Sequence, residues 1–334
     1  LPGAEGPVVG VDGKLYCVAP EMEKEGKPAG FMCHVDLEAG SYNTFAAPAI
    51  DGYGGIPAGC QAEPRGGFWV ADMRLGILHI DRDGEVHQVA TVDAKGEAMQ
   101  GCNDCAFDPA GNLWVTAPAG PIAPAEYTRS MEKPFGSVYC VPGATGLDIA
   151  DITGGTVAVY KVAEGYQFPN GITVSGDGNT LILAETGTKS LWAFDIVSTD
   201  GAETSKVRLL VTINALRINK VPGTHVGGPD GMDFDETGRL LVANWGSGYI
   251  EVFNGQGTLV ERVQCPFTAV SNVHFQPATR RVFATEHTHH AIWEFQWHCR
   301  GQQQLIDGWR VIKGATSTWE DRSGAAPSSK RQKI

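Results

Sequence analysis

The chain has 334 residues, of which 42% are hydrophobic and 19% charged, and its formal net charge is −12. An acidic balance of this size argues against a nucleic-acid-binding surface, which would be basic. No apolar run approaches the ~20 residues that a membrane helix requires, and no signal-peptide pattern is found. We therefore expect no nucleic-acid or membrane partner.

One short pattern recurs along the whole chain. It consists of a polar or glycine residue at its head, a run of alternating apolar residues, a glycine-containing turn and a second apolar run. Six copies are headed by Glu5, Gly59, Asn103, Asn170, Asp230 and Asn272. The heads are separated by 42 to 67 residues, and repeats of this length with strands and turns inside them are typical of β-propellers.

We therefore predict an all-β fold, a six-bladed β-propeller with four-stranded antiparallel blades around a central metal-binding channel. A long two-sheet sandwich is the alternative, but six matching heads make it the weaker interpretation. We expect residues 1–313 to form the propeller domain and the polar residues 314–334 to be a disordered tail. Residues 99–105 and 118–135 are expected to form loops over one face, and 142–167 a surface insertion.

Eight cysteines are dispersed along the chain and do not form the dense pattern of a disulfide scaffold. Cys102 and Cys105 have the spacing of half a zinc site, but no second half follows. We expect both to be reduced thiols, and the location to be cytoplasmic. The chain starts at Leu1, inside the first repeat, and we expect further residues to precede it in the natural protein.

The head residues predict a metal centre. The first strand of each propeller blade lines the central channel, so the six heads should meet at one end of it. Two carboxylates and several amide oxygens are the hard ligands that Ca²⁺ prefers. The alternative is a polar core satisfied by water, but carboxylates gathered without a cation would raise each other's pKa.

A second group follows the heads by one to three residues and consists of Asp104, Asp233 and His274. These side chains could form another site deeper in the channel. From their spacing alone, a His–Asp pair that fills the core is the favoured interpretation.

Longer motifs add a family resemblance. They lie at 2–8 (PGAEGPV), 52–60 (GYGGIPAGC), 71–76 (ADMRLG), 99–108 (MQGCNDCAFD), 116–120 (TAPAG), 127–131 (YTRSM), 167–171 (QFPNG), 230–235 (DGMDFD), 243–247 (ANWGS) and 285–287 (TEH). Across residues 2–297 the chain resembles the calcium-dependent, six-bladed phosphotriesterases of the gluconolactonase and senescence-marker family. It departs from them before the first repeat, in 142–167 and in its tail.

The resemblance implies two calcium ions. A catalytic calcium would be held by Glu5, Asn103, Asn170 and Asp230, and a structural calcium by Asp233, the backbone carbonyl of Val273, and His274. The pocket would be shaped by Ile56, Met73, Arg129, Met131, Phe168, Trp245, Ser271 and Asn272. His287 would join the catalytic group at the pocket wall, with Glu21 and Asp104 behind it. Taken singly, Trp245 and Phe168 could serve packing alone, and His287 could be a structural histidine.

The implied function is hydrolysis of P–F and similar bonds in organophosphorus triesters such as diisopropyl fluorophosphate. Asp230 would attack phosphorus as a nucleophile; the alternative is that the carboxylate or the metal activates a water molecule. Two other functions stay open, a lactonase on the same calcium site and a non-enzymatic calcium-binding propeller. The partner we expect is thus a small organophosphorus or lactone substrate, bound by a monomer.

Overall fold

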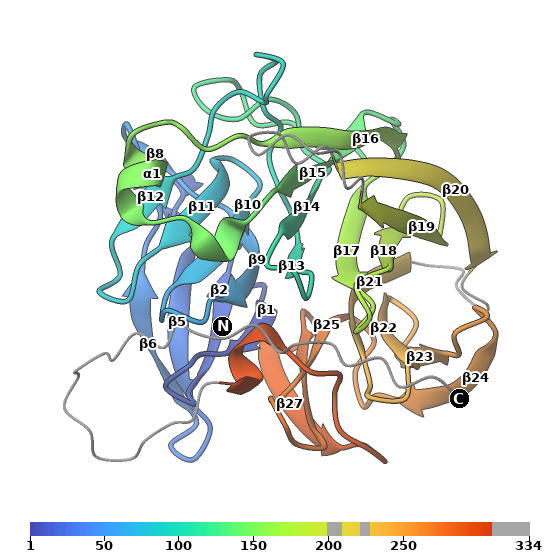
Figure 1. Cartoon of the computed structure of the whole chain (residues 1–334). Coiled ribbons are helices and arrows are strands. Elements are labelled where there is room, and N and C mark those ends of the chain that lie inside the picture. Colours follow the sequence, from blue (N-terminus) through green and yellow to red (C-terminus); the bar gives the residue numbers. More distant parts are fainter. Residues whose placement is uncertain (199–208, 221–227, 309–334) are drawn as a thin grey trace.

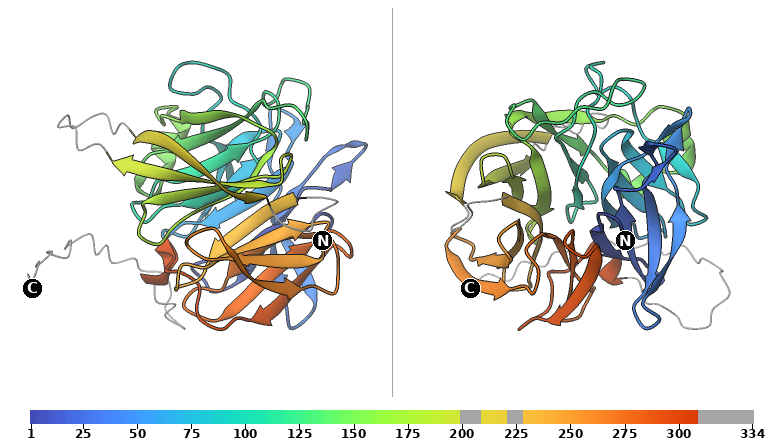
Figure 2. Two further views of the ribbon diagram at one scale, coloured as in Figure 1. Left: turned by 90° about the vertical axis from the view of Figure 1, so that its right-hand side faces the viewer. Right: turned by 180° about the vertical axis from the view of Figure 1, so that it is seen from behind.

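A computed structural model of the chain describes residues 1–198, 209–220 and 228–308. The predicted tail, 314–334, lies outside the described residues. Six antiparallel sheets are arranged as blades around a central axis (Figure 1), which confirms the predicted propeller. The view from behind shows the same ring of sheets (Figure 2, right).

Each blade takes consecutive strands of the chain. The first contains β1 (Glu5–Val9), β2 (Leu15–Ala19), β5 (Phe31–Asp36) and β6 (Ser41–Ala46), and the second contains β9 (Pro57–Ala62), β10 (Phe68–Asp72), β11 (Gly76–Ile80) and β12 (Val86–Gln88). The third contains β13 (Cys105–Phe107), β14 (Leu113–Ala117), β15 (Gly136–Val141) and β16 (Tyr160–Tyr166). The fourth contains β17 (Pro169–Val174), β18 (Thr180–Glu185), β19 (Ser190–Ser198) and β20 (Leu209–Lys220).

The fifth blade contains β21 (Gly228–Phe234), β22 (Leu240–Trp245), β23 (Tyr249–Phe253) and β24 (Leu259–Gln264). The sixth contains β25 (Val270–Phe275), β26 (Arg281–Glu286) and β27 (Ala291–Gln296), so within the described residues it has three strands where four were predicted. Two small hairpins, β3 (Glu23–Lys24) with β4 (Lys27–Pro28) and β7 (Ala49–Ile50) with β8 (Tyr53–Gly54), lie outside the blades.

The first strand of every blade faces the axis, and these inner strands close a ring. Each inner strand contacts the next one, and β25 contacts β1. The second strand of each blade is a nearly continuous apolar run, because both faces of a blade are covered by its neighbours. Trp69 on β10 and Trp114 on β14 are fully buried in this way, and their indole N–H groups donate to Glu63 and Asp108.

The segment between β15 and β16 contains a 3₁₀ turn, η1 (Ala144–Gly146), and a short helix, α1 (Ile149–Thr153). Asp148 and Asp151 form a capping box at the start of α1. The helix packs against β12 of the second blade and buries Ile152 in the core there. The insertion predicted at 142–167 therefore ends before residue 160, where β16 begins as a regular blade strand.

After β27 the chain crosses the end of the channel that lies opposite to the heads. Gly301 bridges to Asp235, Gln302 Nε2 donates to the Val174 carbonyl and Gln304 Nε2 donates to the Phe275 carbonyl. The 3₁₀ turn η2 (Leu305–Gly308) then places Ile306 in the core between the first two blades. This crossing segment, 301–306, covers one end of the channel.

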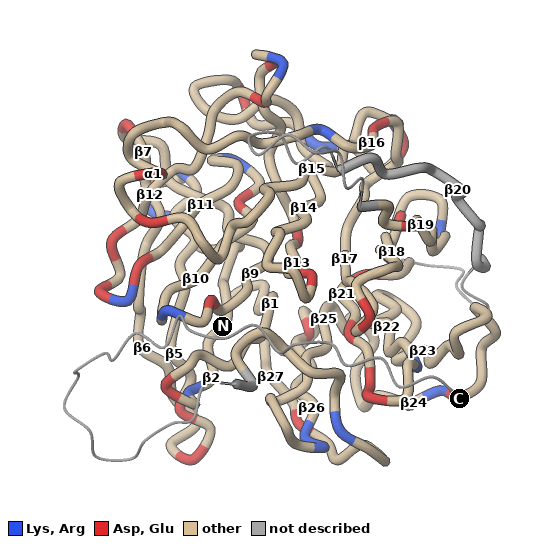
Figure 3. Tube along the Cα trace, in the orientation of Figure 1, with Lys and Arg blue, Asp and Glu red and all other residues tan. Residues whose placement is uncertain are grey.

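Acidic residues are scattered around the ring (Figure 3). No helix in the described part of the chain combines the length and apolar character needed to cross a bilayer.

Candidate metal centre and active site

The heads of the repeats lie where the inner strands begin. Glu5 opens β1, Asn170 and Asp230 lie near the starts of β17 and β21, and Asn103 precedes β13 by two residues. In every blade except the third, the pairing of the inner strand with the second strand is interrupted beside the head, as between Pro229 and Met232 in the fifth blade. Such irregularities bend a strand and change the direction of its side chains.

Glycines beside the heads allow successive blades to approach closely at the axis. A Cβ on Gly171 would lie 2.1 Å from the carbonyl oxygen of Asp230, and a Cβ on Gly231 would lie 2.1 Å from Asn272 Cγ. Gly6, next to Glu5, has a φ of 48°, which favours glycine. Head-and-glycine pairs in the sequence are thus the local signal of a crowded axis.

Buried carboxyl groups gather around this axis. Glu5, Asn170 and Asp230 are at most 9% exposed. Burial, followed by the charges of Glu5 and Asp104, raises the pKa of Asp230 well above its usual value. Burial, with further contributions from Glu5 and Asp233, raises the pKa of Asp104 to about 8. Carboxylates in this arrangement destabilise each other's ionised forms. A bound cation would instead stabilise the ionised forms and lower the pKa values again.

The donor set at the heads fits Ca²⁺ by its chemistry, since it consists of carboxylate and amide oxygens. Within the described residues, no group of three or more His, Cys, Asp or Glu side chains lies at metal-binding distance. The predicted catalytic set contains only two such residues, Glu5 and Asp230, and its other members are the amides of Asn103 and Asn170.

The second group comes together deeper in the channel. Asp233 Oδ1 accepts from the Phe234 N–H and Oδ2 from the Phe275 N–H, and His274 Nδ1 is 3.4 Å from Asp233 Oδ2. Burial lowers the pKa of His274 to about 4, so its imidazole is neutral at pH 7. His274 Nε2 is buried without a hydrogen-bond partner, which leaves a nitrogen available to a ligand.

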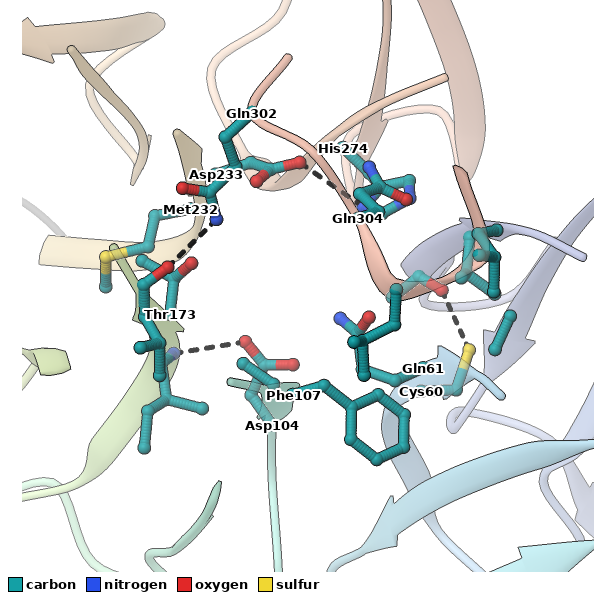
Figure 4. A pocket seen from close by; sticks show the side chains of 18 of the residues that line it. Cys60, Gln61, Asp104, Phe107, Thr173, Met232, Asp233, His274, Gln302 and Gln304 are labelled. Carbon is teal, nitrogen blue, oxygen red and sulfur yellow. Dashed lines mark hydrogen bonds and ion pairs between the residues drawn. The ribbon is translucent and has the colours of Figure 1, made fainter. Parts of the chain in front are cut away.

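A cavity of about 300 Å³ adjoins this second group (Figure 4). Asp104, Asp233 and His274 line it, and Gln302 and Gln304 of the crossing segment bound it. Asp104 also holds the neighbouring strand, because its Oδ2 accepts from the Ile172 N–H.

His287 lies beside Glu5, one of the head residues. Its Nε2 is 3.1 Å from Glu5 Oε1. Burial alone would lower the pKa of His287, but Glu5, and then Glu21 and Glu286, raise it above the usual value. Glu21 itself is half exposed and lies 3.9 Å from His290 Nδ1. The imidazole of His287 therefore pairs with the carboxylate of one head residue.

The residues that were predicted to shape the pocket, called wall residues below, differ in their surroundings. Met73 packs in a small cluster with Ala58 and Ala119, against which Ile56 also lies. Phe168 is buried and has a φ of 54°, an uncommon conformation for a residue with a side chain. Among the remaining predicted residues, Trp245 is half-buried at the end of β22, Arg129 lies on the 118–135 loop, and Met131, on the same loop, is 45% exposed.

The side chains of Ser271 and Asn272 differ in what they bond, and only Ser271 links two blades. Ser271 Oγ is 3.2 Å from the Ala4 carbonyl and 3.0 Å from Thr285 Oγ1, so its hydroxyl joins the sixth blade to the first. Asn272 Oδ1 accepts from the Val273 N–H. Val273, whose backbone carbonyl was predicted to be a ligand, directly precedes His274 on β25.

Sequence reasoning missed three residues that support the site. Thr116 Oγ1 donates to the Asn170 carbonyl at 2.6 Å and accepts from the Asp104 N–H. Tyr127 OH donates to Met73 Sδ at 3.6 Å. Asp72 Oδ1 accepts hydrogen bonds from three backbone N–H groups in the segments next to Met73. Each lies inside a motif quoted above, but the motif does not reveal which contact its residue makes.

Comparisons with known proteins identify a family. Residues 4–288 match the family model "SMP-30/Gluconolactonase/LRE-like region". The diisopropyl-fluorophosphatase of Loligo vulgaris is 48% identical over 313 residues, covering 92% of this chain and 93% of the relative. A putative sugar lactone lactonase of Rhizobium meliloti is 28% identical over 169 residues, covering 51% of this chain and 47% of the relative.

Solved structures show the same fold. A calcium-binding protein, regucalcin, from Agrobacterium tumefaciens has a TM-score of 0.64 at 18% identity, covering 90% of this chain and 92% of that structure. A gluconolactonase from Xanthomonas campestris has a TM-score of 0.64 at 22% identity, covering 88% and 85%.

Proposed function

We propose that this chain, which belongs to the SMP-30/gluconolactonase/LRE-like family, is a calcium-dependent hydrolase that cleaves P–F and similar bonds of organophosphorus triesters. The similarity over nearly the whole chain to the Loligo vulgaris diisopropyl-fluorophosphatase carries the proposal. The buried carboxyl groups at the axis support it, because a hydrolase of this kind needs a cation beside the reacting phosphoryl group.

The residues that would hold the catalytic calcium are Glu5, Asn103, Asn170 and Asp230. A calcium ion there would polarise the phosphoryl oxygen, stabilise the charge that develops on it and keep Asp230 ionised despite its burial. A second, structural calcium would be held by Asp233, the Val273 carbonyl and His274. The buried, unpartnered Nε2 of His274 supports a ligand at that position.

Asp230 is the proposed nucleophile. Attack of its carboxylate oxygen on phosphorus forms an Asp–phosphoryl bond while the P–F bond breaks and fluoride leaves. Hydrolysis of this mixed anhydride at the carboxyl carbon then returns the carboxylate. The product keeps one Asp230 oxygen, and the carboxylate gains one from water. The Ile56 and Met73 side of the pocket would hold the alkyl substituents by apolar contact.

A calcium-dependent activity assay tests the proposal. Purified protein is assayed with diisopropyl fluorophosphate and with a panel of sugar lactones, before and after treatment with a strong chelator. Release of fluoride that stops on chelation and returns with calcium supports the phosphotriesterase. Turnover of lactones alone would assign the chain to the lactonases, to which it is similar at lower identity, and no turnover of either would leave a calcium-binding propeller.

Single turnover in ¹⁸O-water tests the nucleophile. Attack by Asp230 leaves the first product unlabelled and places ¹⁸O in the protein, whereas direct attack by water labels the product at once. Asp230→Asn keeps a carbonyl oxygen but removes the charge, so turnover should collapse while calcium binding weakens moderately. Near-parental turnover of this variant would show that Asp230 is only a ligand.

We propose a monomer, which size-exclusion chromatography with light scattering would test. A reducing, cytoplasmic location is supported by the eight cysteines, all of which are unpaired and six of which are buried.

A further inference from the structure

The thioether of Met73 lies between two hydrogen-bond donors at the pocket wall. Its Sδ is 3.9 Å from Asn103 Nδ2 and 3.6 Å from Tyr127 OH. A thioether sulfur accepts hydrogen bonds weakly and donates none. It therefore favours the NH₂ end of the Asn103 amide over the carbonyl end as its neighbour.

This contact decides which atom the amide can offer to a metal. The two ends of an asparagine amide have nearly the same shape but opposite roles, because only the carbonyl oxygen coordinates a cation. When Nδ2 faces the sulfur, Oδ1 is turned away from it. We propose that Met73 is a positioning residue which holds the Asn103 amide in the orientation that leaves Oδ1 for calcium; this rests on the proposed calcium site.

Met73 is itself held in place from several sides. Its N–H donates to the Ile56 carbonyl at 2.9 Å. The preceding residue, Asp72, accepts from the Ile56 and Arg74 N–H groups and so fixes the backbone on both sides of the wall. The side chain is 6% exposed.

The backbone around Asn103 is equally tight. A Cβ on Gly101 would lie 1.9 Å from the Met73 carbonyl oxygen, so the two segments are in direct contact. The Asn103 N–H donates to the Thr116 carbonyl at 2.8 Å. With both backbones fixed, the side-chain torsions χ1 and χ2 are the freedom that remains for Asn103, and the sulfur biases the rotation of the terminal amide about χ2.

A double-mutant cycle on calcium affinity tests the proposal. Met73→Leu keeps an apolar side chain of similar volume but removes the acceptor. Calcium affinity, measured by isothermal titration calorimetry, should fall by roughly three- to tenfold, as expected for one weak hydrogen bond. Asn103→Ala identifies the binding event that belongs to this site, and Met32→Leu, in the core of the first blade, is the matched control with unchanged affinity.

Asn103→Asp separates orientation from packing. An aspartate has two equivalent oxygens, so its orientation no longer matters. Adding Met73→Leu to Asn103→Asp should therefore change calcium affinity by less than twofold, and the two substitutions are non-additive by the size of the single effect. Met73→Ile repeats the cycle with another shape if the leucine variant proves unstable in urea unfolding.

The calcium affinities of these variants distinguish failure of the inference from failure of the proposed function. An equal loss in both backgrounds would mean that Met73 acts by packing, and no loss in the parent background would mean that it does not act on calcium; either result overturns the inference while the proposed function stands. A parent protein that binds no calcium would overturn the proposed function together with the inference.

Discussion

The buried carboxyl group of Asp72 should make the free energy of unfolding depend on pH, and one substitution isolates this effect. The residue ends β10 and is completely buried. Its Oδ1 accepts from the N–H groups of Ile56, Arg74 and Leu75, at 3.0, 2.8 and 2.9 Å, while Oδ2 has no hydrogen-bond partner. Burial outweighs these three bonds and raises the pKa of Asp72 from 3.8 to about 6.

The raised pKa determines whether stability rises or falls with pH. Between the two pKa values the folded protein holds a proton on Asp72 that the unfolded chain has released, so stability falls as pH rises through this window. The contribution is fully present below the unfolded pKa and lost above about pH 6. Between pH 4.5 and 7.5 the loss is about 2 kcal/mol in the free energy of unfolding.

Asp72→Asn removes this titration while keeping an oxygen for the three N–H groups. Its buried NH₂ lacks a partner and lowers stability at every pH, so the informative quantity is the difference between variant and parent. Relative to the parent, the variant should gain about 2 kcal/mol between pH 4.5 and 7.5, measured by urea unfolding at saturating calcium.

A second carboxylate provides the control. Asp177 also accepts hydrogen bonds, from the Ser175 hydroxyl and the Asn179 N–H, and these bonds lower its pKa. It stays ionised across the whole window and its bonding partners do not titrate there, so the difference between Asp177→Asn and the parent should be constant with pH. A constant difference for Asp72→Asn as well would refute the argument.

Three further predictions concern the axis. Removing calcium with a strong chelator should abolish activity and lower the melting temperature, because the carboxylates around Asp230 are left facing each other; full activity in protein shown calcium-free by elemental analysis would contradict this. Asp233→Ala should lower the melting temperature more than it alters substrate affinity, and a variant that melts like the parent but is inactive would show the opposite role. Gly231→Ala should cost about 1–3 kcal/mol of stability and weaken calcium binding, because its Cβ meets the Asn272 side chain. Gly255→Ala, whose Cβ meets no atom within 4 Å, is the control, and equal unfolding midpoints for the two variants would count against the crowding.

The sequence alone determined the architecture, because each blade is built from strands that are neighbours along the chain. Alternating apolar runs and glycine turns specify such hairpins locally, and their repetition indicates a ring. The heads Glu5, Asn170 and Asp230 could be picked out for the same reason: equivalent positions in equivalent units must lie at the same end of the channel.

The tertiary structure decided what the heads contact. The approach of Gly231 to Asn272, the hydrogen bond from Asn103 to Met73 and the passage of Gln304 under the channel each join residues separated by many positions in the sequence. No local pattern specifies these distances, because they arise only when the sheets have twisted, packed face to face and closed with β25 against β1. Ring closure buries the carboxylates together and thereby creates the electrostatic environment of the site.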